Sequence, residues 1–218
     1  MSNSKNIIFY YDSISPYAWL GWKYFQKIKN RKDVNIEVVP VLFAGLLNFH
    51  KNIGAAEIPA KRIAIFSDII RKAELSHFKF KGPPSHPFNP LKSLRVCLAF
   101  SDPKRIQYTD LLLSGVWEDG EDATSEDFLG GLISKCGEDP GKILKFSNDP
   151  KVKNQLRENT ENCAKNNIFG VPTFEIGSHL FWGADQIPLI ESYLDGKLDL
   201  KLDEIDEFLS RPSSASRL

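Results

Sequence analysis

The chain has 218 residues, and its 28 basic and 28 acidic side chains give a formal net charge of zero. Its composition, 42% hydrophobic and 11% aromatic, is enough for a packed core and excludes a disordered protein. The absence of a basic excess argues against a nucleic-acid partner. Cys97, Cys136 and Cys163 form neither a disulfide framework nor a Cys-x-x-Cys site. The length predicts one or two domains.

No apolar run is long enough for a signal peptide or for a membrane span, which needs about 20 residues. We therefore expect a cytoplasmic protein with reduced thiols and no membrane partner. The last three residues, Ser216-Arg217-Leu218, are similar to the peroxisomal address Ser-Lys-Leu. The tail has no such meaning in a bacterium, whereas in a eukaryote it is compatible with a peroxisomal or mitochondrial location.

The first part of the chain has the pattern strand, helix, strand. Residues 6–12 are apolar and β-prone, which predicts a buried strand. Pro16, preceded by Ser15, is typical of a helix start, and apolar residues follow at helical spacing as far as Ile28. Residues 34–43 predict a second strand. This order is typical of the start of a parallel sheet.

Residues 57–167 carry only helical signals. Pro59 opens a predicted helix with Ile63, Phe66 and Ile70 on one face, which we interpret as ordinary core burial. A further helix is expected to start at Asn89-Pro90, with Leu91, Leu94, Cys97 and Leu98 inward, and another at Asp102-Pro103, which reaches Trp117. Thr124 and Asp127 form a possible capping box at the start of the next helix. The last two helix starts are expected at Asp139-Pro140 and Asp149-Pro150.

The end of the chain returns to sheet. Residues 170–176 and 179–182 predict two strands joined by a turn at Gly177-Ser178, and a helix follows over about 186–194. Residues 210–218 are polar, and we expect them to be disordered.

The junction Ser15-Pro16-Tyr17-Ala18 is a candidate anion site. Backbone N–H groups at a helix N-terminus favour an anion such as a thiolate, and the Ser15 hydroxyl adds one donor. The alternative interpretation is a plain N-cap serine.

Two further candidates lie in the C-terminal part. A cis bond between Val171 and Pro172 would turn the backbone of Val171 toward a peptide-like ligand, which would pair with it as an added strand. The alternative is a proline on an edge strand. In Gly183-Ala184-Asp185, the carboxylate of Asp185 either caps the last helix or accepts hydrogen bonds from the α-amino group of a ligand.

Together, these sites and their order resemble a known fold. A strand, Cys-Pro-x-Cys, a helix, a later cis-proline and a β-β-α ending characterise the thioredoxin fold, and a helical insertion characterises its DsbA-like variant. Ser15-Pro16-Tyr17-Ala18 stands where Cys-Pro-x-Cys would, so dithiol redox chemistry is excluded there. Over about residues 6–200 the chain is similar to the 2-hydroxychromene-2-carboxylate isomerases and kappa-class glutathione transferases. The similar stretches are FYYDSISPY (9–17), GAAEIPAKR (54–62), HPFNPL (86–91), KVKNQL (151–156), FGVPTF (169–174) and FWGAD (181–185).

The resemblance implies an α/β protein, a thioredoxin fold with a large all-helical insertion. Residues 1–50 and 168–200 would form the thioredoxin-fold domain, 51–167 the helical insertion domain, and 201–218 a C-terminal tail. The resemblance also implies glutathione as the cofactor, a small aromatic molecule as the substrate, and a homodimer.

The same resemblance implies roles for individual residues. Ser15 is the expected catalytic residue, which holds the glutathione thiolate, and Pro16 and Tyr17 lie beside it in the cofactor site. The backbone of Val171, before Pro172, would pair with the cysteinyl group of glutathione.

The other end of the cofactor is expected at Asp185, which would meet the γ-glutamyl group. Kappa transferases often have a serine before this aspartate, where this chain has Ala184. One more contact falls on Asn48 or Asn52, of which Asn52 is our candidate.

Asn89 is a candidate substrate contact, with helix capping before Pro90 as the alternative. His50 is the second candidate substrate residue. The other histidines, His77, His86 and His179, are expected in surface or core roles. No metal is expected, since the histidines lack ligand spacing.

Three functions follow from these expectations. The first is a glutathione-dependent isomerase acting on an aromatic 2-oxo acid by reversible thiolate addition. The stretches Gly-Val-Pro-Thr-Phe and Glu-Ile-Pro-Ala-Lys-Arg favour this branch. The second is a kappa-like glutathione transferase, which releases a thioether. The third is a non-catalytic, cysteine-free binding protein with a thioredoxin fold.

Overall fold

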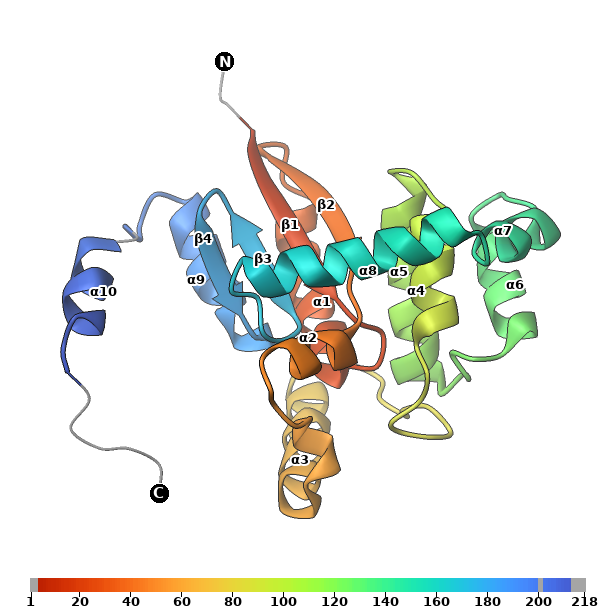
Figure 1. Ribbon diagram of the computed structural model, residues 1–218, viewed down its shortest axis with the longest axis horizontal. Coiled ribbons are helices and arrows are strands. Elements are labelled where there is room, and N and C mark those ends of the chain that lie inside the picture. Colours follow the sequence, from red (N-terminus) through yellow and green to blue (C-terminus); the bar gives the residue numbers. More distant parts are fainter. Residues whose placement is uncertain (1–3, 200–201, 213–218) are drawn as a thin grey trace.

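A four-stranded sheet lies at the centre of the computed structural model, which describes residues 4–199 and 202–212 (Figure 1). Its strand order is β2-β1-β3-β4, with β1 (Lys5–Tyr11), β2 (Val34–Pro40), β3 (Thr173–Ile176) and β4 (His179–Trp182). β1 and β2 are parallel and are joined by α1 (Pro16–Lys29), whereas β1 with β3 and β3 with β4 are antiparallel. This arrangement confirms the predicted β-α-β beginning and β-β-α ending.

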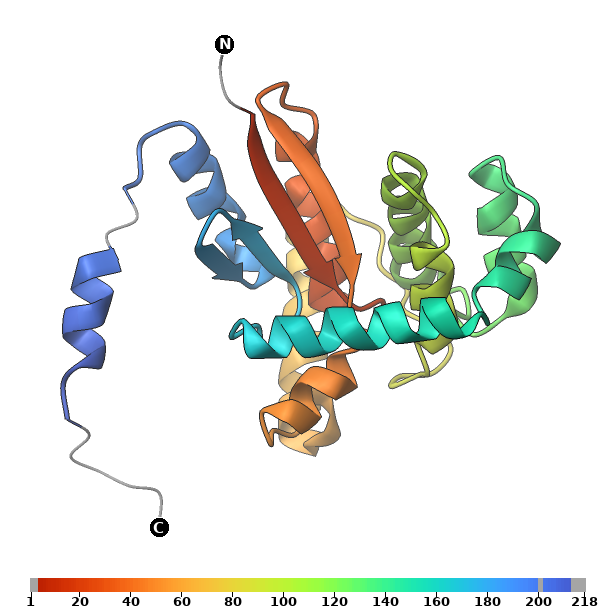
Figure 2. The same ribbon diagram turned by 45° about the horizontal axis from the view of Figure 1, so that its top comes forward.

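The helices between β2 and β3 form the predicted insertion, and residues 57–167 contain no strand. They are α2 (Phe43–Phe49), η1 (Ala55–Glu57), α3 (Pro59–Leu75), α4 (Leu91–Leu98), α5 (Lys104–Ser114), η2 (Gly115–Asp119), α6 (Glu126–Lys135), α7 (Pro140–Phe146) and α8 (Pro150–Lys165). After β4 follow η3 (Ala184–Gln186), α9 (Ile187–Leu194) and α10 (Leu202–Leu209). Figures 1 and 2 show α4–α7 at one end of the molecule, from which α8 runs back past the sheet to β3.

The core between the sheet and α1 is aromatic. Alternate residues of β1 point to the same face of the sheet, and of these Phe9 and Tyr11 are fully buried. The Phe9 ring lies 4.7 Å from that of Trp22 in α1 and 5.0 Å from that of Phe174 in β3. These contacts hold α1 against the two central strands, so its N-terminus has a fixed place at the edge of the sheet.

The second strand is three residues shorter than predicted, because residues 41–43 turn into α2. The N–H of Leu42 donates to Thr160 Oγ1 in α8 at 2.9 Å, and the N–H of Phe43 donates to Asp12 Oδ2 at 2.9 Å. These two side-chain acceptors come from distant parts of the chain. The apolar run that the sequence pattern assigns to one strand therefore leaves the sheet after Pro40 and continues into the first turn of α2.

The predicted inward face of the helix at Pro59 is wrong for two of its three residues. Ile63 and Ile70 are 71% and 50% exposed, whereas Phe66 is partly buried and packs against the core. The buried positions of α3 are Ile69 and Ala73, and Figure 1 shows that this helix projects from the body of the molecule.

The capping box at Thr124 is also wrong, because Ser125 caps α6 by accepting the N–H of Phe128 at 3.3 Å. Thr124 instead donates to Asp122 within an exposed turn. The other helix starts are confirmed, and Asp139 and Asp149 both accept an N–H in the first turn of the helix that follows. The helix from Pro103 reaches Trp117 through the π turn η2.

All three cysteines are buried and free. The expected C-terminal tail, 201–218, contains the helix α10. Of the segment 210–218 that we expected to be disordered, residues 213–218 lie outside the described residues, and these include Ser216-Arg217-Leu218. Among the residues that the structure describes, no helix combines the length and the apolar character needed to cross a membrane.

We expect Thr160→Val to destabilise the fold by about 1–3 kcal/mol, because the partly buried N–H of Leu42 loses its acceptor. The midpoint of thermal unfolding should fall by about 2–4 °C for each kcal/mol. Thr124→Val is the control, because its hydroxyl lies in an exposed turn. Equal midpoints for the two variants would contradict the assignment.

Candidate functional site

Ser15 caps α1 and reaches across to the loop before β3. Its backbone is extended, and Oγ accepts the N–H of Ala18 at 3.2 Å. The same hydroxyl donates to the carbonyl of Val171 at 3.3 Å. The plain N-cap interpretation is therefore correct for the local structure, but the bond to Val171 adds a tertiary contact. Two of the predicted site residues, 156 positions apart, meet here.

The Val171–Pro172 peptide bond is cis, as predicted. The Pro172 carbonyl accepts the N–H of Gly183 at 3.0 Å, which joins this loop to the third candidate. Within residues 4–199 and 202–212, the N–H of Val171 has no acceptor. A peptide-like ligand that ran past this loop would find one unused backbone donor beside the Ser15 hydroxyl.

Gly21, in the second turn of α1, lets the helix approach both loops. A Cβ there would lie 3.2 Å from Pro172 Cγ and 3.4 Å from Ala184 Cα, which is tighter than ordinary packing. Ala184 is buried at this contact. The close approach brings the Ser15, Val171 and Asp185 segments together around the N-terminal half of α1.

Asp185 is exposed and does not cap α9, so the capping alternative is wrong. The N-cap residue of α9 is Gln186, and its amide donates to Asp185 Oδ2 at 3.2 Å. The backbone of Gly183 has a φ of 117°, a conformation that glycine adopts easily, and it carries the chain from β4 into η3. The carboxylate of Asp185 is left at the surface, where a cationic group of a ligand can reach it.

Tyr17 links the start of α1 to α3. Its hydroxyl donates to Asp68 Oδ2 at 2.7 Å, and Lys72 pairs with the same oxygen at 2.7 Å. Burial, followed by the charges of Asp68 and Asp185, raises the pKa of Tyr17 well above its usual value. The phenol therefore stays neutral and serves as a donor. Because Pro16 has no N–H, the first amide donor of α1 also belongs to Tyr17.

Four residues that the sequence analysis did not assign to the site hold the turn before Ser15. Asp12 accepts the N–H of Ile14 at 3.0 Å, and its own carbonyl accepts the N–H of Ser15 at 3.1 Å. The other three lie in the helical insertion. Ser93 Oγ bonds the Ser13 hydroxyl, Trp117 Nε1 donates to the Ser13 carbonyl, and His86 Nε2 donates to the Ile14 carbonyl, each at 3.0 Å.

His86, one of these residues, lies partly buried, in agreement with the expected surface or core role. Burial is the main cause that lowers its pKa, so the ring is neutral. With Nε2 donating to Ile14, Nδ1 is the unprotonated nitrogen, and it is buried without a partner among the described residues.

A charged residue directly after a buried strand was the only sequence signal for Asp12. Its carboxylate is fully buried, and burial raises its pKa to about 7 despite the hydrogen bonds from Phe43 and Ile14, which lower it. The sequence pattern does not predict that Ser93, His86 and Trp117 support this turn, because they approach it only in the folded chain.

The remaining candidates are not joined to this cluster by any contact in the described part of the chain. Asn52 is exposed, and its side-chain oxygen accepts the N–H of Ile53. Asn89 accepts the N–H of Leu91 at 3.0 Å, so the capping alternative is correct for it. His50 ends α2, and its Nε2 is buried without a partner among the described residues. Their predicted roles toward a ligand stay predictions.

We expect the buried Asp12 to make stability depend on pH. The folded pKa is about 7, whereas the unfolded value is about 3.9, so the native state keeps the proton where the unfolded chain has lost it. Stability should fall as the pH rises through this window, by at most about 1.4 kcal/mol per pH unit, and level off above about pH 7. Asp12→Asn should lack this slope.

Urea unfolding at several pH values measures the effect as wild type minus variant. The opposite contribution of His86, whose pKa is lowered, is present in both proteins and cancels. Identical slopes for the two proteins would show that Asp12 does not titrate in this range.

Comparisons with known proteins support the same fold and the same group of relatives. Human glutathione S-transferase kappa 1 is 24% identical over 212 residues, covering 88% of this chain and 92% of the relative. The 2-hydroxychromene-2-carboxylate isomerase of Sphingobium xenophagum is 24% identical over 196 residues, covering 88% and 98%. A solved structure of a 2-hydroxychromene-2-carboxylate isomerase superposes with a TM-score of 0.81 at 20% identity, covering 94% of this chain and 100% of that one.

A family model described as the DSBA-like thioredoxin domain matches residues 6–195, which is most of the chain. The fold confirmed above, with its cis-proline beside the start of α1, agrees with this match. The chain belongs to the DSBA-like thioredoxin domain family.

Proposed function

We propose that this protein is a glutathione-dependent isomerase that acts on an aromatic 2-oxo acid or a related intermediate, in the manner of 2-hydroxychromene-2-carboxylate isomerases. The observation that carries the proposal is the 3.3 Å hydrogen bond from the Ser15 hydroxyl to the Val171 carbonyl. It places a helix N-terminus, a hydroxyl donor and the backbone beside a cis-proline at one point. The alternative is a kappa-like glutathione transferase, since relatives of that name match at a similar identity.

The residues present fit glutathione. A thiolate suits the N-terminus of α1, where the Ser15 hydroxyl and the Tyr17 N–H lie. The unused N–H of Val171 suits a peptide carbonyl, as in strand addition. The exposed carboxylate of Asp185 suits the α-amino group of the γ-glutamyl end. The thiolate and the α-ammonium group of the ligand would therefore meet opposite partial or full charges.

Bound glutathione supplies a sulfur nucleophile that adds to a conjugated carbon of the substrate and later leaves, so that it is regenerated. The protein's part is to keep this sulfur ionised. A thiol titrates near pH 8.5, and each unit of pKa depression requires about 1.4 kcal/mol of preference for the thiolate. The helix N-terminus contributes about 0.3–1 kcal/mol, and a hydrogen bond to a charged group contributes about 1.5–3 kcal/mol. Ser15, by turning its hydroxyl from Val171 to the sulfur, is placed to provide the second contribution.

The neighbouring residues keep the donors in place. Asp12 and the three insertion residues hold the turn, and Tyr17 fixes the first turn of α1 to α3 through Asp68. We further propose that Asn52 contacts glutathione, that Asn89 and His50 face the substrate, and that the protein is a cytoplasmic homodimer. A peroxisomal or mitochondrial location is kept as the alternative for a eukaryotic source.

We expect Ser15→Ala to lower turnover by about tenfold to a thousandfold, because one donor to the sulfur is lost. The fold should stay intact, since the two hydrogen bonds that are removed, from the Ala18 N–H and to the Val171 carbonyl, are worth about 1 kcal/mol each. Ser178→Ala, in the exposed β3–β4 turn, is the matched control. The measurement is isomerisation of 2-hydroxychromene-2-carboxylate with reduced glutathione, and normal turnover of the Ser15 variant would remove Ser15 from the mechanism.

The glutathione balance separates the candidate functions. For the isomerase, the free thiol should stay constant while the substrate is converted, because the sulfur is released again. A transferase would consume one thiol for each product, for example with chlorodinitrobenzene as the electrophile. If reduced glutathione neither raises the unfolding temperature nor supports either reaction, the non-catalytic binding protein becomes the better interpretation. Saturation at about 100 times Kd should otherwise stabilise the fold by about 2.7 kcal/mol.

A further inference from the structure

The C-terminal helix α10 presents an apolar face that belongs to neither hydrophobic core cluster of the described residues. Ile205, Phe208 and Leu209 are 51%, 65% and 72% exposed, and their spacing places them on one side of the helix. Figures 1 and 2 both show α10 apart from the rest of the molecule. Its sequence, LDEIDEFL, is otherwise acidic and contains no basic residue.

A helix of this size does not persist in water by itself. Isolated helices shorter than about 12–15 residues are marginal, because nucleation costs more than a few hydrogen bonds return. α10 has 8 residues. Packing of its apolar face against another surface would supply the missing stability, at about 1.5–3 kcal/mol for each large apolar side chain that becomes fully buried.

A groove of suitable character lies between α1, the end of α3 and α9. Its volume is about 850 Å³, and Leu20, Phe78 and Ile187 give it an apolar lining. Lys23 and Lys27 of α1 and Lys72 of α3 also line it. Lys23 and Lys72 pair with Glu118 and Asp68, whereas Lys27 forms no ion pair among the described residues. An acidic helix with an apolar face complements this wall.

The other wall of the groove belongs to the segment that precedes α10. Asp185, Pro188 and Glu191, from η3 and α9, line it. The acidic side chains of Asp185 and Glu191 would repel an acidic flank of α10, so the favourable orientation puts Asp206, which flanks the apolar face, toward α1 and Lys27. The groove therefore accepts α10 in one rotational setting better than in the opposite one.

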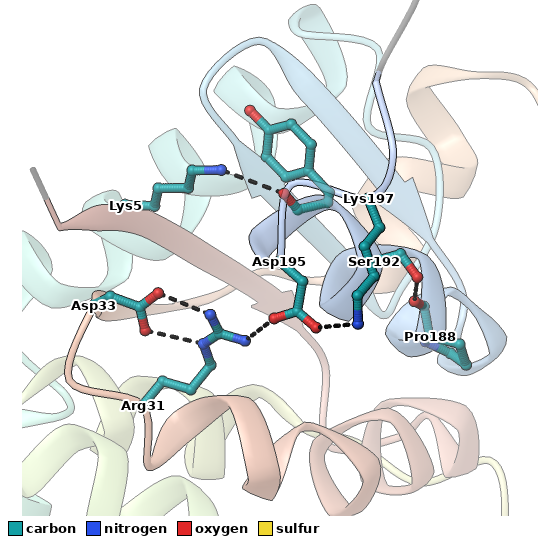
Figure 3. A network of polar contacts seen from close by, with 8 residues as sticks. Lys5, Arg31, Asp33, Pro188, Ser192, Asp195 and Lys197 are labelled. Atoms are coloured by element: carbon teal, nitrogen blue, oxygen red, sulfur yellow. Dashed lines mark hydrogen bonds and ion pairs between the residues drawn. The ribbon is translucent and has the colours of Figure 1, made fainter. Parts of the chain in front are cut away.

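The end of α9 is a glycine turn. Gly196 has a φ of 70°, and the N–H groups of Lys197 and Leu198 both donate to the carbonyl of Ser192. This is the bonding of a helix end that reverses direction at a glycine. Asp195 is fixed between Arg31 and Lys197, at 2.7 and 3.1 Å, as Figure 3 shows.

The length of the connection fits the same geometry. Seven residues, 195–201, separate α9 from α10, and connections of about 2–8 residues are usual between neighbouring antiparallel helices. Both helices have 8 residues and are about 12 Å long. α10 laid antiparallel to α9 would therefore reach back to the N-terminal end of α9, beside Asp185.

We propose that α10 is a strap that folds back along α9 and seats Ile205, Phe208 and Leu209 in the groove between α1 and α9. The occupant is the chain's own C-terminal helix, and the docked helix ends next to Asp185. Its docking does not depend on glutathione, but an effect on the release of glutathione would rest on the proposed function.

The test uses the full-length protein without glutathione. Hydrogen exchange of the α10 amides should be slowed about tenfold or more relative to the double variant Ile205→Asp/Phe208→Asp, in which two charges enter the apolar face. Leu180→Asp, at an exposed apolar position of β4, is the control and should keep the protection. Equal, rapid exchange of α10 in all three proteins would overturn the proposal.

A zero-length carbodiimide cross-link identifies the seat. Asp206 or Glu207 should be joined to Lys27, and the double variant should lose at least about nine-tenths of this product. Carrying out the reaction on a mixture of isotopically heavy and light protein separates the two possible sources of α10. Cross-links within one isotope class support the strap, whereas mixed-mass cross-links would overturn it in favour of a second copy of the chain as the occupant.

Discussion

The carboxylate of Asp12 lies completely buried between two backbone N–H groups, those of Ile14 and Phe43. A buried carboxylate without a cationic partner is costly, and the cost is lowered here by the two hydrogen bonds and by a pKa raised to about 7. Through these bonds one side chain joins the end of β1, the turn before α1 and the start of α2. The position of Ser15 depends on this joint, because the N–H of Ser15 also donates to the Asp12 carbonyl.

The helical insertion completes the support of this turn. Ser93, His86 and Trp117 each bond an atom of residues 13 or 14, so three separate segments of the insertion converge on the turn before α1. A change of packing within the insertion would be transmitted to the Ser15 hydroxyl, which offers a physical reason why the insertion and the thioredoxin-like part are continuous in one core.

The chemistry available at the site follows from what replaces the two thiols of Cys-Pro-x-Cys. Ser15 keeps the position at the helix N-terminus, where an anion is favoured, but a hydroxyl cannot form a disulfide. Under the proposed function, this donor set would stabilise a thiolate that comes from outside the chain. The cis-proline loop beside it retains an unused N–H on Val171, and the close approach allowed by Gly21 keeps the Asp185 segment within the same region.

The sequence by itself determined the order of strands and helices, the helix starts at prolines that follow a small polar or acidic residue, the turn at Gly177, and the candidates Ser15, Val171 and Asp185. These features are local, since they depend on backbone preferences and on spacing along the chain. The end of β2 and the exposed face of α3 were decided by tertiary contacts, as when Thr160 and Asp12 accept the N–H groups of Leu42 and Phe43. The roles of His86, Ser93 and Trp117 were decided in the same way. Their hydrogen bonds form between segments 72–104 residues apart, and spacing along the chain carries no signal for a contact that only packing creates.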